Sequence, residues 1–120
     1  MGEFIKMRMW QVNPKIMCRN HLLGEHVELH MFKSSIEKGI NMDGYIKSNL
    51  LEPLSIINRH EKLVSEMDRR GYNHSSTIGY LRLYQLFDIK DYRYKIDKKK
   101  SLKELLRRCK ECRKLFRRQK

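Results

Sequence analysis

One stretch of this 120-residue chain decides its fold: residues 20–38 read NHLLGEHVELHMFKSSIEK. Side chains suited to an inner face recur there at spacings of three and four residues, as on an amphipathic helix. They are Leu22, His26, Leu29, Phe32 and Ile36. Asn20 suits the N-cap position, and Gly39 suits a stop at the C-terminal end. We therefore predict a helix over residues 20–38 that buries one face.

Two further stretches have the same period. One follows Pro53, which suits a first helical turn, and ends at Gly71. Its inner face consists of Ile56, Ile57, His60, Leu63, Val64 and Met67. The other begins at Ser101, which forms a capping box with Glu104. Its inner stripe consists of Leu102, Leu105, Leu106, Cys109, Cys112 and Phe116.

The remaining segments do not indicate a sheet. Residues 72–94 are rich in tyrosine, and we predict them to be mostly irregular, with one short helix near residues 78–87. No segment alternates with period two for long enough to make a strand pair. The sequence thus predicts an all-α fold: a single compact domain of three main helices with irregular connecting segments.

The size and composition of the chain restrict its class. At 14.6 kDa it is long enough for one compact domain and too short for two. No run of about 18 apolar residues predicts a membrane span, and the N-terminal residues lack the pattern of a secretory signal. Three cysteines, an odd number, fit a reducing compartment. We expect an intracellular monomer, cytoplasmic or associated with the nucleoid.

Positive charge is concentrated toward the C-terminal end. The chain holds 27 Lys and Arg against 14 Asp and Glu, a formal net charge of +13. Twelve basic and two acidic residues fall within residues 98–120, so most of the excess lies in the third predicted helix. This balance disfavours an acidic binding module and favours a polyanionic partner. Phosphate contacts predict binding that weakens steeply with salt.

Three polar residues of the first predicted helix share one side. His21, Glu25 and Glu28 stand at i, i+4 and i+7. They can form a solvated charged face, or they can hold a carboxylate for acid–base or electrostatic work beside a basic surface. A metal-dependent nuclease built on these three residues is a weaker alternative. Adding His26 and His30 suggests chelation, but His26 falls on the apolar face and no further ligands stand at a recognised spacing.

Cys109 and Cys112 have the spacing of half a zinc site. A second pair is missing, and Cys18 alone does not complete the set. Because both sulfurs fall on the inner face of the third predicted helix, we interpret them as core residues. We therefore expect no metal and no cofactor.

One run of residues carries a family resemblance. Residues 17–30, MCRNHLLGEHVELH, resemble the pyrimidine dimer DNA glycosylase family, the family of phage endonuclease V, in which a His-Leu-x-x-Glu-x-x-Glu-Leu stretch opens the first helix. The likeness continues in residues 59–64 (RHEKLV) and 69–73 (RRGYN), and more faintly over residues 96–108. The resemblance implies an all-α glycosylase-like domain over residues 7–120, preceded by an N-terminal extension of residues 1–6.

The resemblance also implies a reaction. The family combines glycosylase and abasic-site lyase activity and uses its N-terminal α-amine as nucleophile. An α-amine has a pKa near 8 and lysine one near 10.4, so the α-amine is more often neutral and nucleophilic at pH 7. Residue by residue, the resemblance assigns catalytic roles to Met7 and Glu28. It assigns DNA contacts to Arg8, His21 and Arg108, and it requires no cofactor.

Two departures from the family pattern shape the expected function. Counting back from His21 places the nucleophilic terminus at Met7, six residues after Met1, and Arg8 is too bulky for normal methionine removal. Val27 and Met31 stand where the phage enzyme has arginines. We expect a base-excision enzyme acting on double-stranded DNA with damaged or abasic sites, most directly at pyrimidine dimers. The alternative is a noncatalytic DNA- or RNA-binding protein that keeps the fold.

Overall fold

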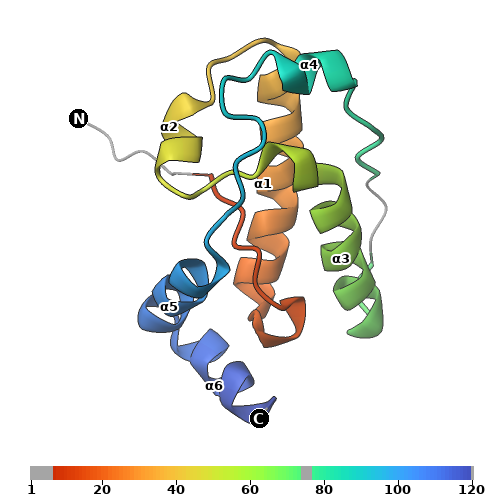
Figure 1. The fold of residues 1–120 in the computed structure, drawn as a ribbon. Coiled ribbons are helices and arrows are strands. Elements are labelled where there is room, and N and C mark those ends of the chain that lie inside the picture. Colours follow the sequence, from red (N-terminus) through yellow and green to blue (C-terminus); the bar gives the residue numbers. More distant parts are fainter. Residues whose placement is uncertain (1–6, 74–76, 120) are drawn as a thin grey trace, which may run out of the picture.

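The computed structural model describes residues 7–73 and 77–119, and within these ranges it contains 63% helix and no strand (Figure 1). The elements are η1 Pro14–Ile16, α1 Arg19–Glu37, α2 Asp43–Lys47, η2 Pro53–Ser55, α3 Ile56–Arg69, α4 Leu83–Phe87, α5 Lys98–Arg108 and α6 Lys110–Arg118. The all-α prediction is confirmed. Within the described ranges, none of these helices has the length and apolar character needed to cross a membrane.

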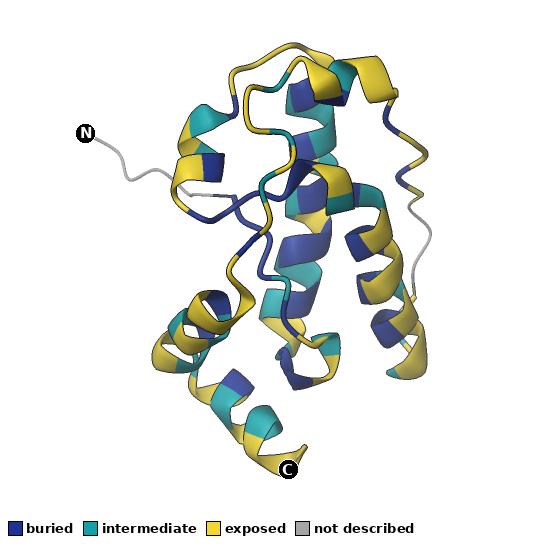
Figure 2. Cartoon of the chain, in the orientation of Figure 1, coloured by how far each residue is buried: buried dark blue, intermediate teal, exposed yellow. Residues whose placement is uncertain are grey.

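The centre of the molecule is the pair of helices α1 and α3. They pack side by side, and each turns its apolar face toward the other (Figures 1 and 2). Leu22, Leu29 and Phe32 from α1 and Leu63 from α3 are fully buried, and burial of each such side chain contributes about 1.5–3 kcal/mol. Both predicted helices are confirmed to within a few residues at each end.

The N-terminal segment joins this core without forming a helix. Met9 and Trp10 are buried, although the sequence pattern did not place them in the core. The backbone N–H of Met9 donates to the carbonyl of Leu50 at 2.7 Å, and the Ser101 hydroxyl donates to the carbonyl of Trp10 at 2.5 Å. The segment therefore lies between the α2–α3 connection and α5.

The α2–α3 connection also holds the start of α5. Asn49, which adopts a left-handed φ of 64°, accepts a hydrogen bond from the Asp97 backbone N–H at 2.8 Å. The buried Glu52 carboxylate accepts from the Ile96 backbone N–H at 2.8 Å. Burial works to raise the pKa of Glu52, but this N–H and the Ser55 hydroxyl bring the pKa below its ordinary value. These buried polar contacts fix where α5 begins.

The prediction of one continuous third helix beginning at Ser101 was wrong. The helix begins at Lys98, because the Asp97 side chain caps it by accepting from the Lys100 backbone N–H at 3.1 Å. Ser101 is buried inside the helix instead, and Glu104 pairs with neighbouring arginines. The chain then leaves the helical conformation at Cys109, with φ −121° and ψ 111°, and restarts as α6.

Two smaller elements also differ from the sequence prediction. The short helix expected near residues 78–87 is confirmed only as α4, over its last five residues. Helix α2 was not predicted, because five residues are too short to show a period. Both lie at the end of the molecule where α1 stops (Figure 1). There Gly39, with φ 76°, takes the left-handed conformation that ends α1.

Candidate active site

The Glu28 carboxylate lies against the N-terminal segment. Its Oε1 atom accepts a hydrogen bond from the backbone N–H of Arg8 at 2.7 Å. Burial raises the pKa of Glu28 above its ordinary value; the Arg8 N–H opposes this rise, and the nearby charge of Glu25 adds to it. Met7, which precedes this N–H, is buried. The two residues expected to be catalytic are thus close together: Glu28 accepts from the backbone N–H of Arg8, and Met7 is the residue directly before Arg8.

Glu25 has a different environment, which neither interpretation of the charged face described. It is 1% exposed, and its two carboxylate oxygens accept from Nε and Nη2 of Arg59 at 2.7 and 2.9 Å. The same guanidinium donates from Nη1 to the carbonyl of Val12 at 2.7 Å. A solvated face was therefore the wrong expectation for Glu25. Its carboxylate neutralises a buried arginine, which removes one of the three ligands of the nuclease alternative.

Arg8 extends from the same segment toward α5. Its guanidinium carbon lies 3.5 Å from the centroid of the Trp10 ring, and its Nη2 atom lies 3.4 Å from the Ser101 hydroxyl. Within the described residues its buried Nε atom has no hydrogen-bond partner. Burial and the positive charge of Arg108 lower the pKa of Arg8 to about 10. A buried arginine with a spare donor beside a second arginine is an environment that an anion would stabilise.

A basic pocket of about 410 Å³ opens beside Arg8. Helix α5 supplies most of its walls, through Lys100, Lys103, Glu104, Arg107 and Arg108. Residues 48–50 close the other side. The Arg108 side chain is 52% exposed and pairs with Glu104. Arg8 and Arg108, both expected to contact DNA, therefore line one pocket although they are distant in sequence.

His21 lies outside this pocket, among cysteines. Its Nδ1 atom is 3.2 Å from the Cys18 sulfur and 3.7 Å from the Cys112 sulfur. Burial, together with the charges of Arg108 and Arg8, lowers the pKa of His21, which favours the neutral imidazole. In this structure the His21 ring lies against sulfur atoms and does not line the basic pocket.

The interpretation of Cys109 and Cys112 as ordinary core residues was incomplete. Their sulfurs lie in one group with those of Cys18 and with the His21 ring, so Cys18 is not isolated. Sequence reasoning missed this group because the two pairs are 91 residues apart. One signal in the sequence could have revealed it: Cys18 and His21 are separated by two residues, as are Cys109 and Cys112.

The histidines of α1 do not form one metal site with Glu25 and Glu28. His26 and His30 pack instead with His60 of α3, with ring centroids 4.8 to 5.0 Å apart. They lie in the α1–α3 interface, where His26 and His60 are buried. The i, i+4 pair of the sequence therefore contributes mainly to the contact between the two helices.

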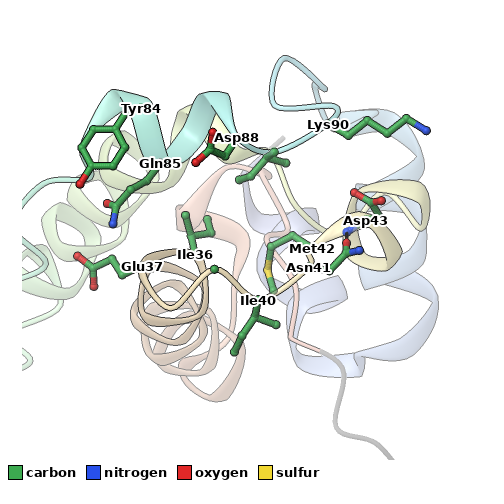
Figure 3. A pocket seen from close by; sticks show the side chains of 12 residues that line it. Ile36, Glu37, Ile40, Asn41, Met42, Asp43, Tyr84, Gln85, Asp88 and Lys90 are labelled. Carbon is green, nitrogen blue, oxygen red and sulfur yellow. Dashed lines mark hydrogen bonds between the residues drawn. The ribbon is translucent and has the colours of Figure 1, made fainter.

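Another pocket, of about 490 Å³, lies near the C-terminal end of α1, among α1, α2 and α4 (Figure 3). The side chains of Glu37, Asp43 and Asp88 line it, with Lys90 as the one basic residue. Three carboxylates repel phosphate, and none of the residues expected to act on DNA lies there. We therefore place the candidate site at Glu28, Arg8 and the basic pocket.

The family model described as pyrimidine dimer DNA glycosylase matches residues 7–79, more than half of the chain. Searches of curated proteins and of solved structures found no match. The family match begins at Met7, includes Arg8, His21 and Glu28, and ends before α5. The chain belongs to the pyrimidine dimer DNA glycosylase family, a family of DNA repair enzymes.

Proposed function

We propose that this chain is a DNA glycosylase with abasic-site lyase activity that removes damaged bases at pyrimidine dimers. The observation that carries the proposal is the 2.7 Å hydrogen bond from the Arg8 backbone N–H to Glu28. A chain that starts at Met7 has its α-amine one residue before this N–H. The nucleophile and the carboxylate then share one small site, as the proposed reaction requires.

The proposed reaction begins with the neutral α-amine. Its nitrogen forms a bond to C1′ of the sugar as the bond from C1′ to the base breaks, and the base leaves with the electron pair. The attached nitrogen then loses a proton and forms a double bond to C1′ as the C1′–O4′ bond breaks; O4′ leaves with the electron pair and takes up a proton, so the sugar ring opens and an imine links it to the protein. Removal of a C2′ proton then breaks the C3′–O bond, which releases the 3′ strand as a phosphate. Water hydrolyses the imine and restores the amine.

Glu28 has two tasks in this reaction. Its negative charge stabilises the positive charge that develops on the sugar as the base leaves, and its oxygens accept and return protons. The raised pKa of Glu28 supports the second task, because a carboxylate that binds protons more readily exchanges them more effectively near neutral pH. The buried Glu25, held by Arg59, does not compete for this role.

The basic pocket supports the contact with DNA. Arg8 from the N-terminal segment and Arg108 from α5 both line it. Phosphates bound between the two would hold the strand next to Glu28. Because these contacts are to the backbone, they position the DNA without reading its sequence.

Lesion recognition is proposed to depend on apolar contact. Val27 and Met31 flank Glu28 on α1 and are 55% and 47% exposed, respectively. Large exposed apolar side chains beside a charged site are suited to stacking against bases that have lost their pairing. Such contact favours a distorted lesion over intact duplex, because a damaged base is easier to extrude.

The test is borohydride trapping with abasic DNA and, separately, with dimer-containing DNA. Two chains are compared, the full chain and one that starts at Met7, and the cross-linked peptide is identified by mass spectrometry. We expect a cross-link at the Met7 amine in the shorter chain, and none in its Glu28→Gln variant with dimer DNA. A cross-link at a lysine or at Met1 contradicts the role of Met7. Tight DNA binding without any cross-link establishes the noncatalytic alternative.

A further inference from the structure

Four side chains from the two ends of the chain meet beside α1. Cys18 and His21 come from the start of α1, and Cys109 and Cys112 come from the junction of α5 and α6. Their sulfur and nitrogen atoms all lie within 4.8 Å of one another. We propose that these four residues bind one Zn²⁺ ion in a tetrahedral, structural site.

The distances fit a tetrahedron of the size that zinc requires. With Zn–S bonds of about 2.3 Å and a Zn–N bond of about 2.0–2.1 Å, two sulfurs stand about 3.8 Å apart and a sulfur and a nitrogen about 3.6 Å apart. The sulfurs of Cys18 and Cys109 are 3.8 Å apart. The His21 Nδ1 atom is 3.2 Å from one sulfur and 3.7 Å from another. Three cysteines with one histidine form a common structural zinc set.

The two pairs occupy equivalent positions on their helices. Cys18 is the N-cap of α1 and Cys109 the N-cap of α6, and each partner follows three residues later in the first turn. Helix N-termini favour thiolates, because their N–H groups and dipoles attract negative charge. The N–H of Cys18 points at the Cys112 sulfur at 3.2 Å, and that of Cys112 at the Cys109 sulfur at 3.4 Å. Such N–H to sulfur contacts are the outer-shell support that metal thiolates require.

Metal binding releases protons and leaves the site with a small net charge. Three thiols each release a proton to solvent, and four lone pairs form the bonds to zinc. The site then carries one net negative charge, since three thiolates outweigh the two charges of Zn²⁺. Arg19 and Lys110 are the residues that follow the two N-cap cysteines in the sequence.

The metal explains how α6 is held. Cys112 is the only buried residue of this helix, which packs on α5 and η1. A helix of nine residues with one buried side chain gains little stability from apolar burial. A metal that links Cys112 to α1 would attach the helix to the rest of the protein. All four positions around the ion belong to the protein, and this closed arrangement is typical of a structural site rather than a catalytic one.

This inference goes beyond the proposed repair activity and changes one expectation. Cys109 and Cys112 lie outside the region that the family model matches, so the family match does not imply the site. The sequence alone had favoured no metal. The family resemblance had assigned His21 to DNA, whereas the geometry assigns its Nδ1 atom to zinc.

The experiment measures metal binding directly and does not depend on activity. The full chain is purified with reductant and without added chelator, and its zinc is determined by mass spectrometry of the elements. The zinc is then exchanged for Co²⁺, which shows thiolate-to-cobalt charge-transfer bands and tetrahedral visible bands. We expect one zinc per chain and both sets of bands. We also expect three thiols that resist alkylation until a chelator is added.

Variants assign the ligands. Loss of an outer-shell contact weakens metal binding by about 10–100-fold. We expect Cys112→Ser and His21→Asn, which remove ligands, to weaken Co²⁺ binding by a larger factor. His30→Asn is the matched control, because it changes a histidine on the same helix that belongs to the other cluster. It should keep the bound zinc and the sulfur bands.

Three results overturn the proposal. The first is a chain whose thiols react at once and which shows no charge-transfer bands with Co²⁺. The second is iron or a disulfide in place of zinc. The third is zinc that survives Cys112→Ser but is lost in His30→Asn. If the cysteine variants fail to fold, the cobalt spectrum and thiol protection of the unmodified chain decide the question.

Discussion

Two regions of the molecule are stabilised by different contacts. The body consists of α1, α3 and the N-terminal segment that packs on them, and the arm consists of α5 and α6. Helix α1 has six buried residues and α3 also has six, and the Glu25–Arg59 pair joins the two helices. Helix α5 has two buried residues and α6 one (Figure 2). The first region relies on extended burial, and the second relies on a few specific contacts. Helices α5 and α6 carry many Lys and Arg side chains, and such side chains are seldom buried without a partner.

The candidate active site lies where these two regions meet. Glu28 of α1 accepts from the Arg8 backbone N–H. On the other side, the Arg8 guanidinium donates to the Ser101 hydroxyl of α5, and Arg108 lines the same pocket as Arg8. Under the proposed function, the chemistry depends on α1 and the N-terminal segment, and the contact with DNA depends on how α5 and α6 are attached. Substitutions in the two regions should have different consequences, and those consequences test the comparison.

The largest effect is expected at Glu28. Glu28→Gln in the chain that starts at Met7 should slow base release by about 10²–10⁴-fold, because the charge that stabilises the sugar cation is lost. DNA affinity should stay equal or increase, since a negative charge is removed next to phosphate. Single-turnover kinetics and a binding titration measure the two effects. Glu37→Gln on the same helix is the control and should change neither, and full activity of Glu28→Gln would refute the assignment.

The same variant has a consequence for stability. A carboxylate with a raised pKa binds protons more readily in the folded state than in the unfolded state, so its contribution to folding worsens as pH rises through that pKa. At pH 7 the Glu28→Gln variant should therefore melt at an equal or higher temperature than the parent chain. The difference should shrink below the ordinary pKa of 4.5. Calorimetry at both pH values checks the sign, and a lower melting temperature for Glu28→Gln at pH 7 contradicts it.

Loss of Arg59 tests the body. Arg59→Ala leaves Glu25 buried and unpaired, and it should destabilise the protein by about 3–5 kcal/mol. Arg69→Ala, on the exposed side of the same helix, should cost about 1 kcal/mol or less, because Glu66 keeps its pair with Arg70. Urea unfolding of both variants measures the difference. Equal costs would mean that the buried pair is not what joins α1 and α3.

A smaller effect is expected where the arm meets the N-terminal segment. Ser101→Ala removes the hydrogen bond to the Trp10 carbonyl and leaves that buried acceptor unpaired, at a cost of about 1–3 kcal/mol. Ser65→Ala, at an exposed position of α3, should stay within about 0.5 kcal/mol of the parent chain. Thermal unfolding compares the two. If both variants melt together, the arm does not depend on this contact.

The smallest effect is expected on the exposed face of the arm. Arg108→Ala should weaken binding to all DNA sequences alike and reduce the salt slope by about one. Lys62→Ala, an exposed cation on α3, should leave the slope unchanged. Binding titrations over a range of salt concentrations measure both. A loss confined to one DNA sequence would mean that Arg108 contacts bases instead of phosphates.

Local pattern predicted the body well and the arm poorly. Helices α1 and α3 alternate buried and exposed positions with the helical period, so spacing alone located them, and the glycines after each one indicated their ends. The arm has equally regular spacing, but a tertiary contact decided its form. Ser101 has the sequence signature of a helix cap, yet its hydroxyl donates to the carbonyl of Trp10 instead. Cys109 fits an apolar stripe, yet the helix breaks there and its sulfur turns toward Cys18.

The candidate site also has residues that the sequence identified and contacts that only the structure revealed. The resemblance selected Glu28, Arg8 and Arg108 from the sequence, whereas the pairing of Glu25 with Arg59 could be found only in the structure. Glu25 and Glu28 stand on one helix face three residues apart, and no local signal distinguishes the buried carboxylate from the half-buried one. The distinction comes from Arg59, which lies 34 residues away in sequence.

The sequence by itself determined the helical class, the two central helices, the basic C-terminal end and the family. These properties depend on composition, on period and on short motifs, which are local. Only the tertiary structure decided which carboxylate meets the N-terminal backbone, where the third helix breaks, and that Cys18 and His21 lie beside Cys109 and Cys112. The physical reason is that each of these depends on groups far apart in the chain, which burial of the shared core brings within bonding distance.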